Sequence, residues 1–279
     1  LAIAAMLGDD YDFELIDGNL IADPAAHIIE RAQATGAALL GVTVMPGPQL
    51  RQAVPVCRQI KCALPELTIL WGGYFPSNHY ETALRSDYVD YCIIGQGETA
   101  FRQFVDTFYS GGSMQEVPSL AYCENGSLQV TPRAPIAPLE NLPRYPYHKI
   151  DMPQYIGTSY LGQRVGAHHT SWGCPFACNF CAIVPLAKRQ WVGESPARVA
   201  EVVAYQQQQW QIDGMEFHDM DFFVKQDCTG EFTKRMVDMN IDWWALGRVD
   251  TLMSYDDYTF ATLAKSGAKM IFMGAESGD

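Results

Sequence analysis

Apolar runs alternate with amphipathic stretches along the first 112 residues, at the rhythm of a doubly wound α/β domain. Such continuous apolar strands are usually buried on both faces, as in a parallel sheet. Because the chain opens on the end of a helix at residues 1–8, we expect this domain to lack a first strand. The expected strands are 13–17, 38–45, 68–73 and 89–94, and the expected helices are 24–35, 49–64, 79–86 and 98–109.

The pattern dissolves between residues 113 and 165, which we assign to a linker. Glycine and proline signals are frequent there. Two short apolar runs, 120–123 and 128–131, flank the sequence Glu-Asn-Gly at 124–126. An Asn-Gly pair between such runs predicts a small β-hairpin.

From residue 166 to 279 the alternation resumes. A strand from Ala167 leads into a cysteine-rich segment, and three to four βα units follow. We interpret this region as the first part of a (β/α) barrel, truncated at its C-terminal end because a barrel needs more units. The expected helices are 196–210, 229–239 and 255–266, and the expected strands are 215–218, 243–246 and 270–274.

Composition and charge narrow the function classes. The 279 residues are 48% hydrophobic, with no apolar stretch long enough to cross a bilayer. Nineteen basic against 32 acidic residues give a formal charge of -13, which repels nucleic acids and anionic membranes. Nothing in the sequence marks the protein for export, so we expect a cytoplasmic location. In that reducing compartment, eight cysteines are more often ligands or buried thiols than disulfides.

Three cysteines are clustered. Cys174, Cys178 and Cys181 have the spacing CxxxCxxC, which lets one short loop hold three irons of a [4Fe-4S] cube and leaves the fourth iron without a cysteine. A zinc site would require a fourth protein ligand, for which His168 and His169 are the nearby candidates. The remaining alternative is three buried thiols.

This spacing, with Phe180 just before the last cysteine, resembles the radical SAM superfamily. The resemblance implies that the three cysteines ligate a [4Fe-4S] cluster, which binds S-adenosylmethionine (SAM) and cleaves it reductively. It also implies that Phe180 contacts the adenine, whereas a core aromatic is the alternative.

Four polar residues follow strands of the second region. Asp219 and Asp221 lie in GMEFHDMDFF (214–223), Arg248 in GRVD (247–250) and Glu276 in GAESGD (274–279). These segments resemble strands of cobalamin-dependent radical SAM proteins, which implies contacts to SAM. Helix capping and surface ion pairing are the alternatives. All four residues are expected at the C-terminal rim of parallel strands, where barrels place their chemistry.

Two glycine motifs lie ahead of the cysteines. Gly72 and Gly73 end the strand TILWGG, and Gly95 and Gly97 follow VDYCII. Glycines there permit tight turns and close approach of a ligand to the backbone. In this order, the motifs resemble the cobalamin-binding domain that precedes many radical SAM cores, with Gln96 in place of the usual acid.

The resemblance therefore implies an α/β protein with an N-terminal Rossmann-like cobalamin-binding domain and a partial radical SAM barrel. It implies an enzyme that uses cobalamin to methylate or rearrange an unactivated carbon of a small-molecule substrate. An electron donor such as flavodoxin or ferredoxin would be its partner. Radical SAM chemistry without cobalamin, a non-catalytic corrinoid or Fe-S sensor, and a structural zinc domain are the alternatives.

Overall fold

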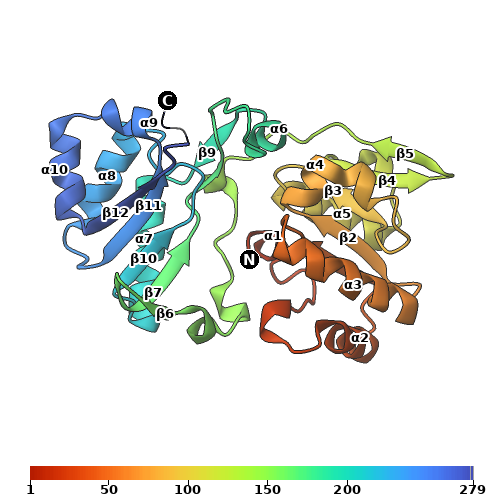
Figure 1. Cartoon of the computed structure of the whole chain (residues 1–279). Coiled ribbons are helices and arrows are strands. Elements are labelled where there is room, and N and C mark those ends of the chain that lie inside the picture. Colours follow the sequence, from red (N-terminus) through yellow and green to blue (C-terminus); the bar gives the residue numbers. More distant parts are fainter. Residues whose placement is uncertain (277, 279) are drawn as a thin grey trace. The chain divides into compact units, whose positions relative to one another are not determined.

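The computed structural model describes residues 1–276 and 278, so Ser277 and Asp279 of the segment 274–279 lie outside the described residues. The chain divides into two compact units (Figure 1). Unit 1 consists of Leu1–Ala137, Leu142–Pro146 and Cys178–Lys188. Unit 2 consists of Pro138–Asn141, Tyr147–Ala177 and Arg189–Asp279.

Unit 1 contains a five-stranded sheet in the order β1-β2-β3-β4-β5. The first three strands are parallel, and the last two form an antiparallel hairpin that pairs with β3. The hairpin predicted around residues 124–126 is therefore confirmed, and it extends the first sheet. The strands are β1 (Leu39–Thr43), β2 (Thr68–Gly72), β3 (Tyr91–Ile93), β4 (Leu120–Glu124) and β5 (Ser127–Val130).

Helices cover both faces of this sheet. Ile69 and Trp71 of β2 pack into a core that includes Ile60 of α3, whereas Leu70 between them packs into a core with Phe104 of α5. This alternation confirms the doubly wound arrangement that the apolar strands predicted. The helices of unit 1 are α1 (Ala2–Ala5), α2 (Pro24–Thr35), α3 (Pro48–Ala63), α4 (Tyr74–Ala83), α5 (Glu98–Ser110) and α6 (Ile183–Ala187).

Two predictions for unit 1 are wrong. Residues 13–17 belong to no β-ladder of the described structure. Phe13 packs against the core that includes Phe104 of α5, and Glu14 pairs with Arg31 of α2. The helix expected at 79–86 begins five residues earlier, at Tyr74. Pro76 lies in the first turn of this helix, where proline is tolerated because its missing N–H would have no partner.

Unit 2 contains a second five-stranded sheet in the order β12-β11-β10-β7-β6. Four of its strands are parallel, as expected for the first part of a barrel, and β6 is antiparallel to β7. A separate antiparallel pair, β8 and β9, was not predicted. The strands are β6 (Gly157–Ser159), β7 (Gly162–His168), β8 (Ser171–Gly173), β9 (Trp191–Gly193), β10 (Gly214–Phe217), β11 (Asp242–Gly247) and β12 (Ala268–Met273).

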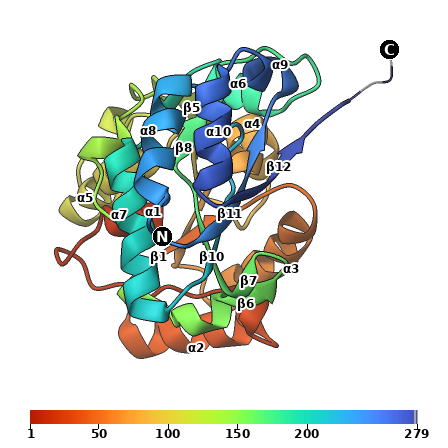
Figure 2. The same ribbon diagram turned by 90° about the vertical axis from the view of Figure 1, so that its left-hand side faces the viewer.

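Helices α7, α8 and α10 cover one face of this sheet (Figure 2). Met215, Phe217 and Trp243 of the strands fill the core beneath them. The predicted helix boundaries are shifted by up to three residues, since the helix expected at 229–239 runs from Gln226 to Met236. The strand expected from Ala167 begins five residues earlier, at Gly162, inside the segment 113–165 that was assigned to a linker. The helices are α7 (Pro196–Trp210), α8 (Gln226–Met236), α9 (Val249–Met253) and α10 (Asp257–Lys265). Short 3-10 turns lie at Gly18–Leu20, Met114–Glu116, Leu139–Asn141, Tyr147–Lys149 and Met152–Tyr155.

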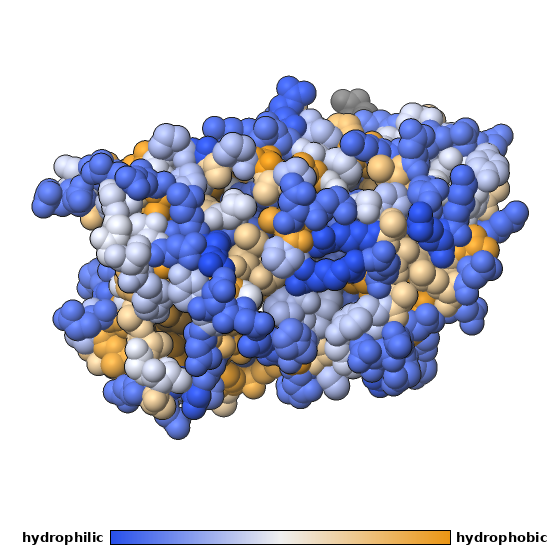
Figure 3. All heavy atoms as spheres, turned by 180° about the vertical axis from the view of Figure 1, so that it is seen from behind, coloured by the Kyte–Doolittle hydropathy of each residue, from blue (hydrophilic) through white to orange (hydrophobic). Residues whose placement is uncertain are grey.

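The face of the molecule shown in Figure 3 is mostly hydrophilic. On the face shown in Figure 3, hydrophobic residues form small separate areas between hydrophilic ones. Among the described residues, no helix combines the length and the apolar character that crossing a membrane requires.

Candidate functional site

The two glycine motifs of unit 1 meet at neighbouring strand ends. The Ser77 hydroxyl in the first turn of α4 donates a hydrogen bond to the carbonyl oxygen of Gly73 at 2.6 Å. The same hydroxyl accepts one from the backbone N–H of Gly95 at 2.9 Å. One buried serine therefore joins the ends of β2 and β3, at the edge where open α/β sheets bind ligands.

Gly73 and Gly95 are required by the backbone itself. Their φ angles are +93° and +86°, a region that L side chains rarely adopt. A Cβ on Gly73 would also lie 3.3 Å from the carbonyl oxygen of Val44. Gly72 differs, because a Cβ there would meet no atom within 4 Å. Gly97 has an ordinary φ of -95°.

Gln96 stands where the family pattern has an acid, and its side chain is only 7% exposed. Its amide nitrogen donates to the carbonyl oxygen of Ala137 at 3.2 Å, and its amide oxygen accepts from the Ala137 N–H at 2.7 Å. A carboxylate could not make both bonds. Gln96 therefore fixes the chain beyond the hairpin to the end of β3.

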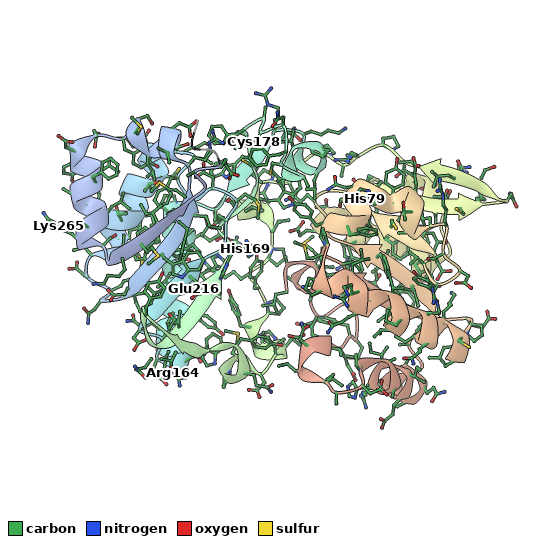
Figure 4. All side chains as sticks on the ribbon, viewed as in Figure 1. His79, Arg164, His169, Cys178, Glu216 and Lys265 are labelled. Atoms are coloured by element: carbon green, nitrogen blue, oxygen red, sulfur yellow. The ribbon has the colours of Figure 1, made fainter. Side chains whose placement is uncertain are left out.

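The three clustered cysteines fall in different units. Cys174 follows β8 in unit 2 and is buried, whereas Cys178 and Cys181 are half-buried members of unit 1. The backbone N–H of Cys181 donates to the Cys178 carbonyl oxygen at 3.1 Å, just before α6 (Figure 4 labels Cys178). Phe180, the expected adenine contact, is 67% exposed.

Helix α6 is anchored within unit 1. Asn78 of α4 donates its side-chain amide to the carbonyl oxygen of Ala182 at 3.2 Å. Arg133 donates to the carbonyl oxygen of Leu186 at 2.7 Å. The cysteine-bearing segment is thus bound to α4 and to the irregular segment that follows the hairpin.

In the part of the chain that the structure describes, no three His, Cys, Asp or Glu side chains are close enough together to hold a metal ion. The assignment of Cys174, Cys178 and Cys181 as cluster ligands thus rests on the motif and stays a prediction.

Asp219 is 0% exposed and joins the end of β10 to the start of β8. Its Oδ1 accepts hydrogen bonds from the N–H and the hydroxyl of Thr170, at 3.0 and 3.1 Å, and from the Ser171 hydroxyl. Burial raises the pKa of this carboxyl group. Asp219 therefore holds the strand that leads into Cys174.

Asp221 is also 0% exposed. Its Oδ1 accepts a hydrogen bond from the N–H of Phe223 at 3.0 Å, whereas Oδ2 is buried without a hydrogen-bond partner. Burial raises its pKa to about 6, against an opposing attraction from Arg248. A buried carboxyl oxygen without a partner is costly, which makes Asp221 a candidate for contact with a bound molecule.

Arg248 lies beside the cysteine segment of unit 2. Its guanidinium carbon is 4.1 Å from the centre of the Phe176 ring, between Cys174 and Cys178 in sequence. It also donates two hydrogen bonds to Asp250, at 2.9 and 2.7 Å, and this pairing lowers the pKa of Asp250. Glu276 is exposed, and no contact in the described structure joins it to the other predicted residues.

Sequence reasoning missed a buried charged network behind the end of β7. His168 Nε2 and Arg198 Nε contact the two carboxylate oxygens of Glu194, each at 2.8 Å. The Tyr147 hydroxyl lies 3.3 Å from His168 Nδ1. The i, i+4 spacing of Glu194 and Arg198 at the start of α7 was the available signal.

A second missed group lies on the opposite face of the same sheet. His218 Nε2 is 3.1 Å from Glu216 Oε2, and the rings of His218 and His169 are 6.0 Å apart between centres. Figure 4 labels His169 and Glu216, which come from the ends of β7 and β10. Glu216 and His218 are two residues apart along a strand, so they share one face. That spacing was readable in the sequence.

Comparisons with known proteins agree with these observations. A family model described as the B12 binding domain matches residues 1–105. The chain is 26% identical over 282 residues to the uncharacterized methyltransferase PH0819 of Pyrococcus horikoshii, covering 99% of the chain and 59% of that relative. It is 22% identical over 228 residues to the anaerobic magnesium-protoporphyrin IX monomethyl ester cyclase of Synechocystis, covering 80% of the chain and 45% of the relative.

Two solved structures share the fold. The radical S-adenosylmethionine methyltransferase TsrM from Kitasatospora setae, with cobalamin and a [4Fe-4S] cluster bound, matches 98% of the chain with a TM-score of 0.77 at 16% identity. The cobalamin-dependent S-adenosylmethionine radical enzyme OxsB, with aqua-cobalamin and S-adenosylmethionine bound, matches 99% with a TM-score of 0.78 at 17% identity. The chain spans 55% and 41% of these two proteins.

These matches agree with the order of motifs along the chain. The glycine-bounded strand ends fall inside the matched 1–105, and the CxxxCxxC spacing follows. Residues 1–105 therefore match a B12 binding domain in sequence, and the chain shares the α/β fold of the two solved proteins.

Proposed function

We propose that this chain belongs to a radical SAM enzyme that binds a [4Fe-4S] cluster, SAM and cobalamin and that methylates a small-molecule substrate at an unactivated carbon. The observation that carries the proposal is a B12-binding domain followed by the CxxxCxxC spacing in one chain. When bound, these groups would supply reductive cleavage of SAM and a methyl carrier. Rearrangement or cyclisation is the second candidate, since one relative is a cyclase.

The residues present suit these groups chemically. Three thiols within eight residues are the donor set of an iron–sulfur cluster that keeps one iron open. No atom lies within 4 Å of a Cβ built on Gly72, at the carboxyl end of β2, where open α/β sheets bind their ligands. Cys174, Cys178 and Cys181 would hold the cluster, and the ends of β2 and β3 would contact cobalamin.

The polar residues of unit 2 would divide into two roles. Asp219 positions the strand before Cys174 through the three hydrogen bonds that its Oδ1 accepts from Thr170 and Ser171. Its Oδ2, like that of Asp221, is buried without a hydrogen-bond partner, so Asp219 is also a candidate for contact with a bound molecule. Asp221 and Arg248 lie at the next strand ends and are the better candidates for contact with SAM. Contacts of Phe180 with the adenine and of Glu276 with a ribose hydroxyl remain part of the proposal.

The first test is the metal content of the protein. We expect anaerobically reconstituted protein to contain iron, sulfide and cobalt, with an EPR signal of a reduced four-iron cluster that SAM perturbs. A Cys174→Ala, Cys178→Ala, Cys181→Ala variant should lose the iron but keep the cobalt. A Cys228→Ala variant is the matched control, because Cys228 lies on α8 outside the motif and should leave both metals unchanged.

The alternatives give different results in the same experiment. Iron without cobalt would indicate radical SAM chemistry that does not use cobalamin. Iron and cobalt without SAM cleavage, under reduction by flavodoxin or dithionite, would favour a sensor. Zinc in place of iron would contradict the proposal.

A further inference from the structure

A hollow in the surface of unit 1 lies at the amino end of β3, whereas Gly95 follows the carboxyl end of that strand. Its volume is about 320 Å³, at the lower end of the range of small-molecule sites. We call it the hairpin pocket, because the end of β4 in the hairpin forms one wall. The first residue of β3 and residues 112–115, which follow α5, form the rest.

The strand register brings three side chains of the hairpin pocket together. Tyr91 of β3 is paired with Tyr122 of the antiparallel β4, and their ring centres are 5.7 Å apart. Glu124 follows Tyr122 by two residues along the strand, so its side chain leaves the same face of the sheet. Helix α5 packs on that face and ends at Ser110, and the pocket lies beyond its last turn.

Tyr122 carries a hydrogen-bonding group into the pocket. The residue is only 5% exposed, yet in the part of the chain that the structure describes no group forms a hydrogen bond with its hydroxyl. A tyrosine that is so deeply buried usually has a partner for its hydroxyl. Burial and the charge of Glu124 raise the pKa of Tyr122, so the hydroxyl keeps its proton and can both donate and accept. A molecule in the pocket would supply the partner.

The charge of the hairpin pocket is negative. Among the described residues that line it, Glu124 alone carries a charge, and its side chain is exposed. Asp90, which precedes Tyr91, is paired with Lys61 at 2.8 Å. The carboxylate of Glu124 therefore attracts a cation and repels an anion. The two tyrosine rings favour a planar cation, because the face of an aromatic ring is negative.

We propose that the hairpin pocket binds a small planar organic cation, an amidinium or guanidinium compound, which donates hydrogen bonds to Glu124 and Tyr122 and packs against the ring of Tyr91. The two N–H groups of such a cation lie side by side, so they match the two oxygens of a carboxylate. The pocket is separate from the carboxyl ends of β2 and β3. This inference therefore goes beyond the proposed function and does not depend on it.

Two probes of nearly equal shape test the inference on the 279-residue chain. Benzamidine is a cation at neutral pH, whereas benzamide is uncharged. Binding is followed through the ring NMR signals of isotope-labelled tyrosines. We expect benzamidine to shift the signals of Tyr91 and Tyr122 and to bind about tenfold more tightly than benzamide, the contribution of one hydrogen bond to a charged group.

A matched pair of variants locates the effect. Glu124→Gln retains the size of the side chain but loses its charge, so this variant should bind benzamidine and benzamide equally. Glu30→Gln, at an exposed position on α2, changes the net charge by the same amount and should keep the preference. Equal binding of both probes by the unaltered protein, or a preference that survives in Glu124→Gln, would overturn the inference.

A Tyr122→Phe variant tests the hydroxyl. Both probes should bind several-fold more weakly, while benzamidine remains the preferred one because Glu124 is unchanged. The midpoint of thermal unfolding should not fall, since no described group of the protein bonds to this hydroxyl. Unchanged affinity for both probes, or a lower midpoint, would count against the inference.

Cobalamin separates the hairpin pocket from the glycine motifs. Protein incubated with aqua-cobalamin should bind benzamidine as tightly as cobalt-free protein, because Tyr91 and Gly95 lie at opposite ends of β3. Displacement of benzamidine by cobalamin would place the probe at the carboxyl ends of the strands and would overturn the inference. The metal analysis of the proposed function is independent of these results.

Discussion

The carboxyl ends of the strands are built differently in the two units. In unit 1 the ends of β2 and β3 consist of glycines and backbone groups that Ser77 joins, and the nearby thiols of Cys57 and Cys92 are buried with raised pKa values of about 11 and 12. In unit 2 the strand ends carry buried charged side chains. A neutral end with open backbone suits a large flat ligand, whereas a charged end fixes neighbouring loops and presents donors and acceptors.

The largest loss of stability should follow the removal of a buried charged partner in unit 2. Replacing Glu194 by Ala leaves His168 and Arg198 without their shared carboxylate in a buried site, and such losses cost about 3–5 kcal/mol of folding free energy. Hydrogen exchange of the amides in β7 and β10 would report this loss for unit 2 alone. Glu231→Ala is the control, because its pair with Arg235 is exposed and worth less than about 1 kcal/mol. Equal losses in both variants would contradict the comparison.

Removing the buried charge of Asp221 should instead increase the stability of the protein. Asp221 has a folded-state pKa of about 6, above its ordinary value of 3.8, so the folded protein binds more protons between these pH values and becomes less stable as the pH rises through them. Asp221→Asn should therefore raise the free energy of unfolding at pH 7 by up to about 3 kcal/mol, with little change below pH 4.

The control for that prediction is Asp250→Asn, which should show the reverse sign. Arg248 lowers the pKa of Asp250, so this carboxylate stabilises the protein at neutral pH and loses its contribution as the pH falls. Urea unfolding at pH 4 and pH 7 would measure both variants. A gain in stability for Asp250→Asn would show that the two carboxylates do not differ as described.

A single methyl group added at Gly73, where β2 ends in unit 1, should lower the stability of that unit. Gly73→Ala places a Cβ at a φ of +93° and 3.2 Å from the Thr43 methyl carbon, so we expect a loss of about 1–3 kcal/mol in the stability of unit 1. Gly72→Ala should change stability little, because nothing lies within 4 Å of its Cβ. If Gly72 contacts cobalamin, this second variant should instead weaken cobalt retention.

The smallest expected effect is on the titration of one histidine, His169. His169 should remain neutral down to about pH 5 in an NMR titration, because its pKa is lowered to about 4. Its contribution to stability is therefore present above its ordinary pKa of 6.5 and is lost as the pH falls below that value. In a His218→Asn variant the pKa of His169 should rise, because a neighbouring ring that can carry a positive charge is removed. An unchanged titration would mean that burial alone sets the value.

The sequence was sufficient for elements whose apolar residues are continuous or periodic. Most strands of both sheets and the Asn-Gly hairpin were found because local patterns determine them. The exceptions are β6 and the start of β7, which lie in the segment 113–165 that the sequence assigned to a linker. The start of α4 was missed because Gly73 and Pro76 do not continue a periodic apolar pattern, although both residues suit the beginning of a helix.

The polar partners were beyond sequence reasoning for a different reason. Asp219 lies 49 residues from Thr170, and His168 lies 26 residues from Glu194, so the register of β7 against β10 and the packing of α7 bring them together. No local pattern encodes those distances. The predicted roles of Phe180, Asp221, Arg248 and Glu276 remain predictions, because each depends on a molecule that must be bound to test it.

The hairpin of unit 1 affects the order in which the strands of the first sheet pair during folding. Asn125 and Gly126 both have positive φ, the turn that matches the twist of a two-stranded ribbon, and hairpins of this kind form within about 1–10 μs. The pairing of Leu39 with Thr68 must first close a long loop around α3, and such distant contacts form later. We therefore expect β4 and β5, the last strands of this sheet along the chain, to be the first to pair during folding.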